Sequence, residues 1–131
     1  MRLLAIFCCV ALATLLEACG ESPAIGDVIG VWVNADGATL TLEESGQFSA
    51  KALPQQIFWR HDQPGYLDGK GTWTLVKGNP YWQVRLYFHE ISGKPASREV
   101  PVLVASSGAT SYLYQWEEGE GEARYRLARR R

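Results

Sequence analysis

The chain is poor in the residues from which most catalytic and metal sites are built. Its 131 residues include only 3 Cys, 2 His and 1 Met. The 13 Lys and Arg residues are balanced by 14 Asp and Glu residues, so the formal net charge is −1. Without a basic excess to neutralise phosphates, a general nucleic-acid binder is excluded. The 47% hydrophobic content excludes a disordered tail, and the length excludes several domains.

The two histidines stand apart from the partners that catalysis or metal binding would need. Neither His61 nor His89 has a second His or a Cys at metal-ligand spacing. No Gly-x-Ser-x-Gly nucleophile motif occurs. The four glutamates between residues 117 and 122 do not follow EF-hand spacing, and a solvated hairpin tip explains them better than a calcium loop. We therefore expect no enzyme, no cofactor and no metal.

Long hydrophobic runs are also scarce, and the one at the N-terminus is short. Arg2 is followed by an apolar run at residues 3–16. Fourteen residues fall short of the roughly 20 that cross a bilayer. A basic start, a short apolar run and a small residue at its end are typical of a secretory signal. Residues 1–18 are thus predicted to be a signal peptide.

The junction after this run concerns Cys19. The sequence Leu-Glu-Ala-Cys-Gly at residues 16–20 resembles the lipobox of bacterial lipoproteins. That resemblance implies that Cys19 becomes a lipidated N-terminus, with residues 19–28 as a tether. Its acyl chains, at about 0.8 kcal/mol per buried CH₂, would anchor the protein to a membrane of the cell envelope. If the host is Gram-negative, the expected membrane is the outer one. The alternative is a plain secretory signal cut near Ala18, leaving Cys19 as a free thiol.

The cysteine count favours the lipid anchor. Cys8 and Cys9 lie inside the apolar run and leave with it, so Cys19 is the single Cys of the exported chain. One thiol cannot form an intramolecular disulfide, and a leftover Cys in an exported protein calls for a use. Lipid attachment supplies that use.

Residues 29–131 are predicted to form one all-β domain. Alternating apolar and polar residues separated by glycine turns indicate strands, and no segment shows a sustained helical period. The eight expected strands cover residues 29–34, 38–43, 47–52, 71–77, 81–90, 99–105, 110–117 and 122–128. Short turns between them favour an antiparallel meander, which removes its edges by closing into a barrel. A β-sandwich is the alternative, and Pro101 indicates an edge or bulge position.

One connection differs from the short turns. Residues 53–70 separate the third and fourth expected strands, and loops of this length are usually functional. A short helix is expected within residues 55–61, with Ile57 and Phe58 turned inward. The segment would cap one end of the barrel, either as a structural plug or as the lid of a ligand site.

Two resemblances support the barrel. Gly30-Val31-Trp32 resembles the Gly-x-Trp motif of lipocalin and wider calycin barrels. The motif implies that Trp32 closes one end of the barrel and that a basic residue of the last strand, Arg126 or Arg129, covers it. A group of small uncharacterised bacterial lipoproteins has a similar order of segments to the one seen here: GVWVNADGATLTL, GKGTWTL, WQVRLYF and YLYQWEEGEGEARYRLARR. This resemblance implies a fold and a location in the cell envelope, but no activity.

Aromatic residues are the remaining signal. Alternation puts seven of them on expected inward faces: Trp73, Trp82, Phe88, Tyr112, Tyr114, Trp116 and Tyr125. An eight-stranded barrel is wide enough either to be filled by such side chains or to hold one small ligand. If it holds a ligand, the site is expected at the mouth under residues 53–70, with Trp59 and His61 as contacts and Trp73 or Trp82 beneath.

The C-terminal arginines are expected at the surface. Arg124 and Arg126 would face outward on the last strand, with Gln115 or Glu117 across from them. Residues 129–131 would form a basic end beside the tether, where each Arg near an anionic leaflet contributes up to about 1 kcal/mol.

These features favour a non-enzymatic, lipid-anchored envelope lipoprotein that binds a small apolar ligand or an envelope protein. The alternative is an inhibitor or immunity protein for a cell-wall enzyme or toxin. An enzyme is the third and weakest hypothesis.

Overall fold

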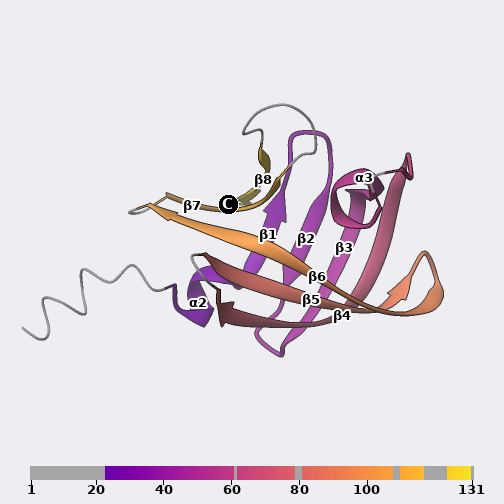
Figure 1. The fold of residues 1–131 in the computed structure, drawn as a ribbon. Coiled ribbons are helices and arrows are strands. Elements are labelled where there is room, and N and C mark those ends of the chain that lie inside the picture. The colour runs from indigo at the N-terminus through magenta and orange to yellow at the C-terminus, as the bar shows by residue number, and fades with distance from the viewer. Residues whose placement is uncertain (1–22, 61, 79–80, 108–109, 117–123, 131) are drawn as a thin grey trace, which may run out of the picture.

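The chain folds into a closed eight-stranded barrel (Figure 1). The computed structural model describes residues 23–60, 62–78, 81–107, 110–116 and 124–130. Each strand pairs antiparallel with the next along the chain, and the last pairs with the first. The predicted all-β meander barrel is therefore confirmed, and the β-sandwich alternative is wrong. The predicted signal peptide and Cys19 lie outside the described residues.

Two helical turns accompany the strands. The elements in chain order are α2 (Ile25–Val28), β1 (Gly30–Val33), β2 (Thr39–Leu42), β3 (Gln47–Pro54), α3 (Gln55–Phe58), β4 (Tyr66–Lys77), β5 (Trp82–Ile91), β6 (Lys94–Ser107), β7 (Thr110–Trp116) and β8 (Arg124–Arg129). The turn α2 lies within residues 19–28, expected to be a tether, and its Val28 is buried against the barrel. The two turns lie at opposite ends, since β1 begins after α2 and α3 follows the end of β3, which runs the same way as β1 (Figure 1).

The long connection is shorter than the sequence predicts. Strand β3 continues to Pro54 and β4 begins at Tyr66, and these two residues pair with each other. The connection is thus residues 55–65, and the expectation of an eighteen-residue loop is wrong. The short helix is confirmed at Gln55–Phe58, with Phe58 buried and Ile57 packed against the core.

A bulge in β3 explains why the sequence pattern places the end of this strand too early, at residue 52 instead of Pro54. The register shifts between Ala50 and Leu53, and Ala52 has a φ of 56°. The Asp68 carboxylate holds this turn by accepting a hydrogen bond of 2.9 Å from the Ala52 N–H. Alternation therefore breaks at Ala52, which is half-buried rather than inward, while Leu53 enters the core.

The barrel interior is filled by apolar side chains from all eight strands. Trp32, Phe48, Phe88 and Leu127 are among its almost fully buried members, and the Phe48 and Phe88 rings meet edge to face at 4.9 Å. Within the described part of the chain no polar or charged residue is buried. Aromatic pairs of this geometry contribute about 0.5–1.5 kcal/mol beyond the burial of their area. These side chains form one contiguous apolar core.

The strand β6 is longer than its pairing with β7, so part of β6 is an edge. Strand β6 pairs with β5 along most of its length but with β7 only from Leu103 to Ser107. Pro101 lies in the segment without β7 pairing, and its carbonyl accepts a hydrogen bond from the Gln115 amide on that side. The missing N–H of Pro101 therefore costs no ladder hydrogen bond, which confirms the predicted edge position.

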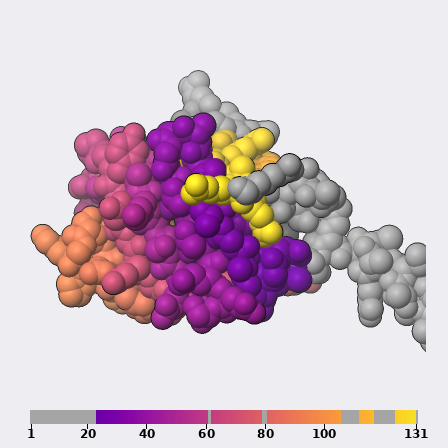
Figure 2. All heavy atoms as spheres, turned by 180° about the vertical axis from the view of Figure 1, so that it is seen from behind, coloured from indigo at the N-terminus to yellow at the C-terminus, as the bar shows by residue number. Residues whose placement is uncertain are grey.

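The end beside α2 is closed by Trp32. The Trp32 indole N–H donates to the Val28 carbonyl at 2.8 Å, and the Arg129 guanidinium lies 4.9 Å from the centre of the Trp32 rings. Arg129 also donates to the Asp27 carbonyl. Of the two candidates for covering Trp32, Arg129 is the one that does so. Figure 2 shows the last strand, in yellow, lying on the indigo N-terminal elements, with which Arg129 and Ala128 pair.

The position of Arg129 corrects the expectation of a solvated basic end. Arg129 belongs to β8, and the Arg130 N–H continues the pairing by donating to the Val31 carbonyl at 2.7 Å. The side chains of Arg129 and Arg130 are both exposed, as expected of residues 129–131, but Arg129 also lies over Trp32. Arg131 lies outside the described residues.

We expect Arg129→Gln to lower the free energy of unfolding by about 1–2 kcal/mol, because it removes the stacking on Trp32 and the hydrogen bond to Asp27. Arg130→Gln is the matched control. It keeps the backbone hydrogen bond to Val31 and should change stability by less than about 0.5 kcal/mol. Urea unfolding, monitored by tryptophan fluorescence, measures both free energies. Equal effects of the two substitutions would contradict the assignment of Arg129 as the residue that covers Trp32.

Candidate functional site

The residues predicted to form a ligand site do not come together. Trp59 follows α3 at one end of the barrel. Trp82 is the first residue of β5, which runs in the same direction as β1, so it lies at the α2 end. Trp73 also points to that end, since its indole N–H donates to the Glu43 carbonyl in the β2–β3 turn at 2.9 Å. His61 lies outside the described residues.

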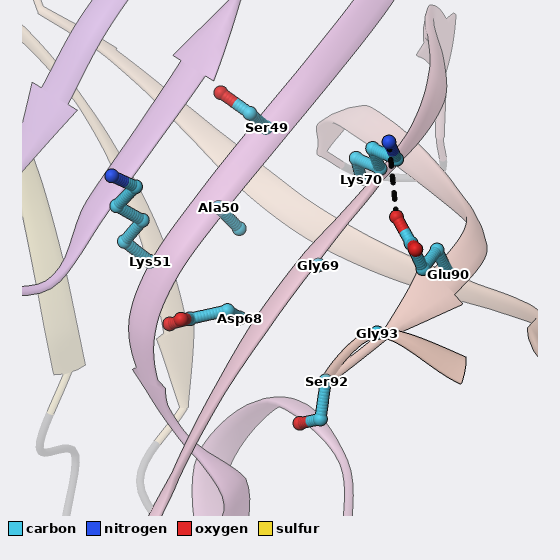
Figure 3. A pocket seen from close by; sticks show the side chains of 9 residues that line it. All are labelled: Ser49, Ala50, Lys51, Asp68, Gly69, Lys70, Glu90, Ser92 and Gly93. Carbon is cyan, nitrogen blue, oxygen red and sulfur yellow. Dashed lines mark ion pairs between the residues drawn. The ribbon is translucent and has the colours of Figure 1, made fainter. Parts of the chain in front are cut away.

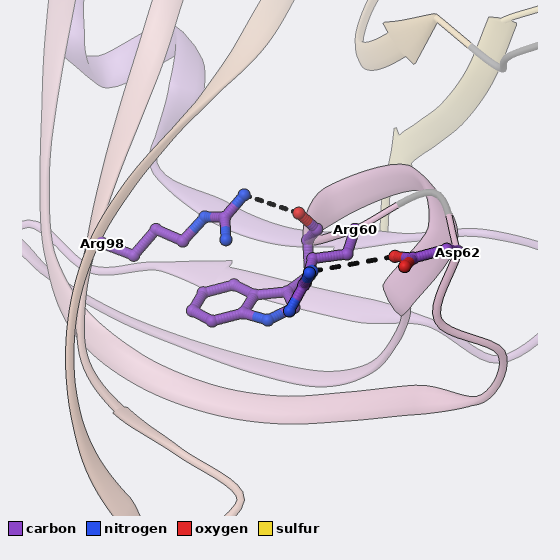
Figure 4. Close-up of polar contacts among 4 residues, drawn as sticks. Arg60, Asp62 and Arg98 are labelled. Carbon is purple, nitrogen blue, oxygen red and sulfur yellow. Dashed lines mark hydrogen bonds and ion pairs between the residues drawn. The ribbon is translucent and has the colours of Figure 1, made fainter.

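Segment α3 fills the mouth that the sequence assigned to a ligand. The Phe58 ring meets Tyr125 of β8 edge to face at 5.6 Å, and the Trp59 ring meets Phe88 of β5 at 6.4 Å. Arg98 of β6 contacts both the ring and the backbone of Trp59. Its guanidinium lies 4.1 Å from the Trp59 ring centre and donates to the Trp59 carbonyl at 2.6 Å (Figure 4).

These contacts favour the plug over the lid. Side chains of β5, β6 and β8 all contact the segment, so moving it would break two aromatic contacts and the Arg98 interactions together. The nearby Arg60–Asp62 ion pair, at 3.7 Å, lies on the exposed side and adds little.

A shallow depression on the outside of the barrel is lined by polar residues, three of which are paired within the protein. It lies where β3, β4 and the β5–β6 turn meet, and Lys70 and Glu90 pair across its edge at 3.1 Å (Figure 3). Asp68 is occupied by the Ala52 N–H, and its own carbonyl accepts from the Ser92 N–H at 2.8 Å. The side chains of Asp68, Lys70 and Glu90 are thus engaged within the protein, and the Asp68 contact holds the bulge at Ala52.

Metal ligands are not gathered in the part of the chain that the structure describes. No group of three or more His, Cys, Asp or Glu side chains lies close enough there to hold an ion. A helix of sufficient length and hydrophobicity to cross a membrane is likewise absent from the described residues.

The outer face of β7 is where the structure departs most from expectation. Leu113 is fully buried and pairs with Leu127 of β8, so these residues face the core. Tyr112, Tyr114 and Trp116 therefore point outward, and the prediction that they line the interior is wrong. Tyr125 of β8 is inward and Arg126 outward, as expected.

The outward residues of β7 and β8 form one cluster, the aromatic–arginine face, made of Tyr112, Tyr114, Trp116, Arg124 and Arg126. The ring centres of Tyr112 and Tyr114 are 5.7 Å apart, and those of Tyr114 and Trp116 are 5.5 Å apart. Register places Trp116 opposite Arg124 and Tyr114 opposite Arg126, in place of the expected Gln115 and Glu117. Cross-strand neighbours on one face of a sheet interact, so the pairing builds the cluster.

The arginines lie over the rings. The Arg124 guanidinium is 4.7 Å from the Tyr114 ring centre and 4.9 Å from that of Trp116, and it donates to the Tyr112 hydroxyl at 2.7 Å. The Arg126 guanidinium is 4.7 Å from the Tyr112 ring centre. Such cation–π contacts contribute about 0.5–1 kcal/mol each at exposed sites, so both guanidinium groups are held in place.

Tyr114 is the centre of this face. It is only 2% exposed although it lies outside the barrel core, and it pairs with the buried Leu103 of β6. Burial raises the pKa of the Tyr114 phenol, and the nearby Tyr81 and Tyr112 add to that rise while Arg124 opposes it. Trp116, at 40% exposure, presents the edge of the cluster to solvent.

Alternation could not identify this face, but one signal in the sequence could have. Both β7 and β8 were predicted to turn their aromatic side chains inward. Directly opposite residues of two paired strands lie on the same side of the sheet, so the β7 residues opposite Tyr125 and Leu127 must be the inward ones. Counting the register across the hairpin would have placed Leu113, not Tyr114, in the core.

Comparison of the chain with protein-family models, with curated proteins and with solved structures finds no match.

Proposed function

We propose that this chain is a lipid-anchored cell-envelope lipoprotein that acts without catalysis, by binding an envelope protein through the aromatic–arginine face. One observation carries the proposal. Three aromatic side chains in mutual contact and two arginines lie on the outside of a barrel whose interior holds a contiguous apolar core.

The composition of the face supports protein binding. The outer surface of a soluble barrel is normally polar, whereas β7 places Tyr112, Tyr114 and Trp116 on that side, with Trp116 exposed, Tyr112 half-buried and Tyr114 buried beneath them. Tyr, Trp and Arg are the residues most enriched among those that dominate protein–protein binding energy. The ring–ring and arginine–ring contacts hold these side chains in place before a partner arrives, which lowers the entropy cost of association.

The alternative of a small apolar ligand receives less support. A ligand inside the barrel would have to displace Phe58 and Trp59 together with Arg98, which joins them to β6. An inhibitor or immunity protein is a special case of the proposed function, in which the bound partner is a cell-wall enzyme or a toxin. Identifying the partner separates the two.

The anchor rests on the lipobox-like junction at residues 16–20. Three residues separate Cys19 from Pro23, where the described chain begins, and the four steps along the chain span at most roughly 14 Å. A lipid on Cys19 would therefore keep the α2 end of the barrel close to the membrane, with the wall formed by β7 and β8 free to meet a neighbouring protein.

We expect the wild-type protein to incorporate labelled palmitate and sediment with membranes in its native host, and Cys19→Ala to do neither. Cys9→Ala is the matched control, because Cys9 lies in the apolar run and should leave with the signal peptide. Labelled Cys19→Ala protein in the membrane pellet at the wild-type level would refute the lipid anchor.

The binding face is tested by photo-crosslinking in intact cells. Ala128 is exposed on β8 and pairs with Tyr112, so a photoreactive residue there borders the face without removing a member of it. Thr74, exposed on β4, carries the same residue as the control for the opposite wall. We expect a discrete protein adduct from position 128 and none from position 74.

Two results would contradict this function. Adducts of equal yield and equal mass from both positions would show that the envelope crowds the barrel without recognising a face. The lack of any adduct from position 128 would show that the face is not occupied in the cell.

A further inference from the structure

We infer that the aromatic–arginine face recognises carboxylates, and that its partner presents an acidic protein segment whose Asp or Glu side chains pair with Arg124 and Arg126. This inference rests on the proposed function and names the chemistry of the partner at the same site.

The first argument is the state of the two arginines. Among the described residues, Arg85 pairs with Glu99 at 3.4 Å and Lys70 with Glu90 at 3.1 Å, on the outer wall of β4 to β6. Arg124 and Arg126 have no carboxylate partner within the described part of the chain, although they lie two residues apart on the same face. The face therefore carries two positive charges that the described structure does not neutralise.

The second argument is geometric. A guanidinium has five N–H donors in its plane, and Arg124 directs one nitrogen to the Tyr112 hydroxyl. The group lies 4.7 Å from the Tyr114 ring centre and 4.9 Å from that of Trp116, and these perpendicular rings flank it while its other N–H donors stay in its own plane. A carboxylate approaching in that plane can accept two parallel hydrogen bonds, the strongest pairing that Arg makes.

The third argument is the surrounding apolar surface. Tyr114 and Leu103 are buried beside the arginines, and Trp116 forms a partly exposed wall. A partner that covers this wall would exclude water from the ion pairs, and a lower local dielectric strengthens them. The rings thus supply burial while the guanidinium groups supply direction.

The size of the charged site favours a protein segment over a polyanion. Two arginines on one hairpin face provide for one or two carboxylates, whereas a nucleic acid needs a continuous basic track. The chain as a whole has a formal net charge of −1, which supplies no such track.

The test repeats crosslinking from position 128 in four backgrounds of the full chain in its native membrane. These are the unaltered protein, the pair Arg124→Gln with Arg126→Gln, the pair Arg124→Lys with Arg126→Lys, and Arg85→Gln. The last removes an arginine from an existing ion pair on the neighbouring wall and is the matched control. Thermal unfolding confirms that each variant is folded, and the single Gln substitutions replace the pair if it lowers the midpoint.

We expect the Gln pair to reduce the adduct at least about tenfold, since removing one partner of a buried charge pair costs that much or more in affinity. The Lys pair should also lose adduct, because Lys keeps the charge but not the planar fork. Arg85→Gln should leave the yield unchanged. Mass spectrometry of the adduct should find Asp or Glu in the crosslinked partner peptide.

Failure of this inference is distinguishable from failure of the proposed function. An adduct of full yield in the Gln pair would overturn carboxylate recognition and leave the binding face standing. A partner peptide without acidic residues would overturn it as well. No adduct from position 128 with both arginines present would overturn the proposed function and this inference together.

Discussion

The volume inside an eight-stranded barrel limits everything else in this protein. Such a barrel has room for a core of side chains or for one small ligand, and here Trp32, Phe48, Phe88 and their neighbours form a contiguous core. Both ends are then shut by short helical turns that bring aromatic or apolar residues onto the core: Val28 with Trp32 at one end and Phe58 with Trp59 at the other. An interior occupied in this way supports the proposal that the protein binds its partner through the outer wall.

Local sequence patterns predicted the fold well because its contacts are mostly between neighbouring strands. Glycine turns and alternation were enough to find eight strands, and the Gly-x-Trp resemblance led to the contact between Arg129 and Trp32. Strand ends were harder. Asp68-Gly69 looks like a turn, but pairing with β3 and the bulge at Ala52 overrode that preference and began β4 at Tyr66.

The candidate site was not predictable from single strands. In β7, aromatics alternate with Leu113 and Gln115, so the more hydrophobic side appeared to be the inner one. Only the register with β8 decides the matter, because Leu113 lies opposite Leu127. For a related reason, the sequence did not predict that Trp59 lies at one end of the barrel and that Trp73 and Trp82 lie toward the other. In a meander, successive turns alternate between ends, which places Trp82 far from α3.

The central claim, that the barrel interior is filled and recognition lies outside, is tested most directly by apolar ligand binding. The purified barrel is titrated with fatty acids and hydrophobic fluorescent probes while tryptophan emission is recorded. The account predicts no saturable change, whereas Phe58→Ala, which empties space beside Tyr125, should gain one. Saturable binding of one apolar molecule by the unaltered protein, with displacement of Trp59, would contradict the account.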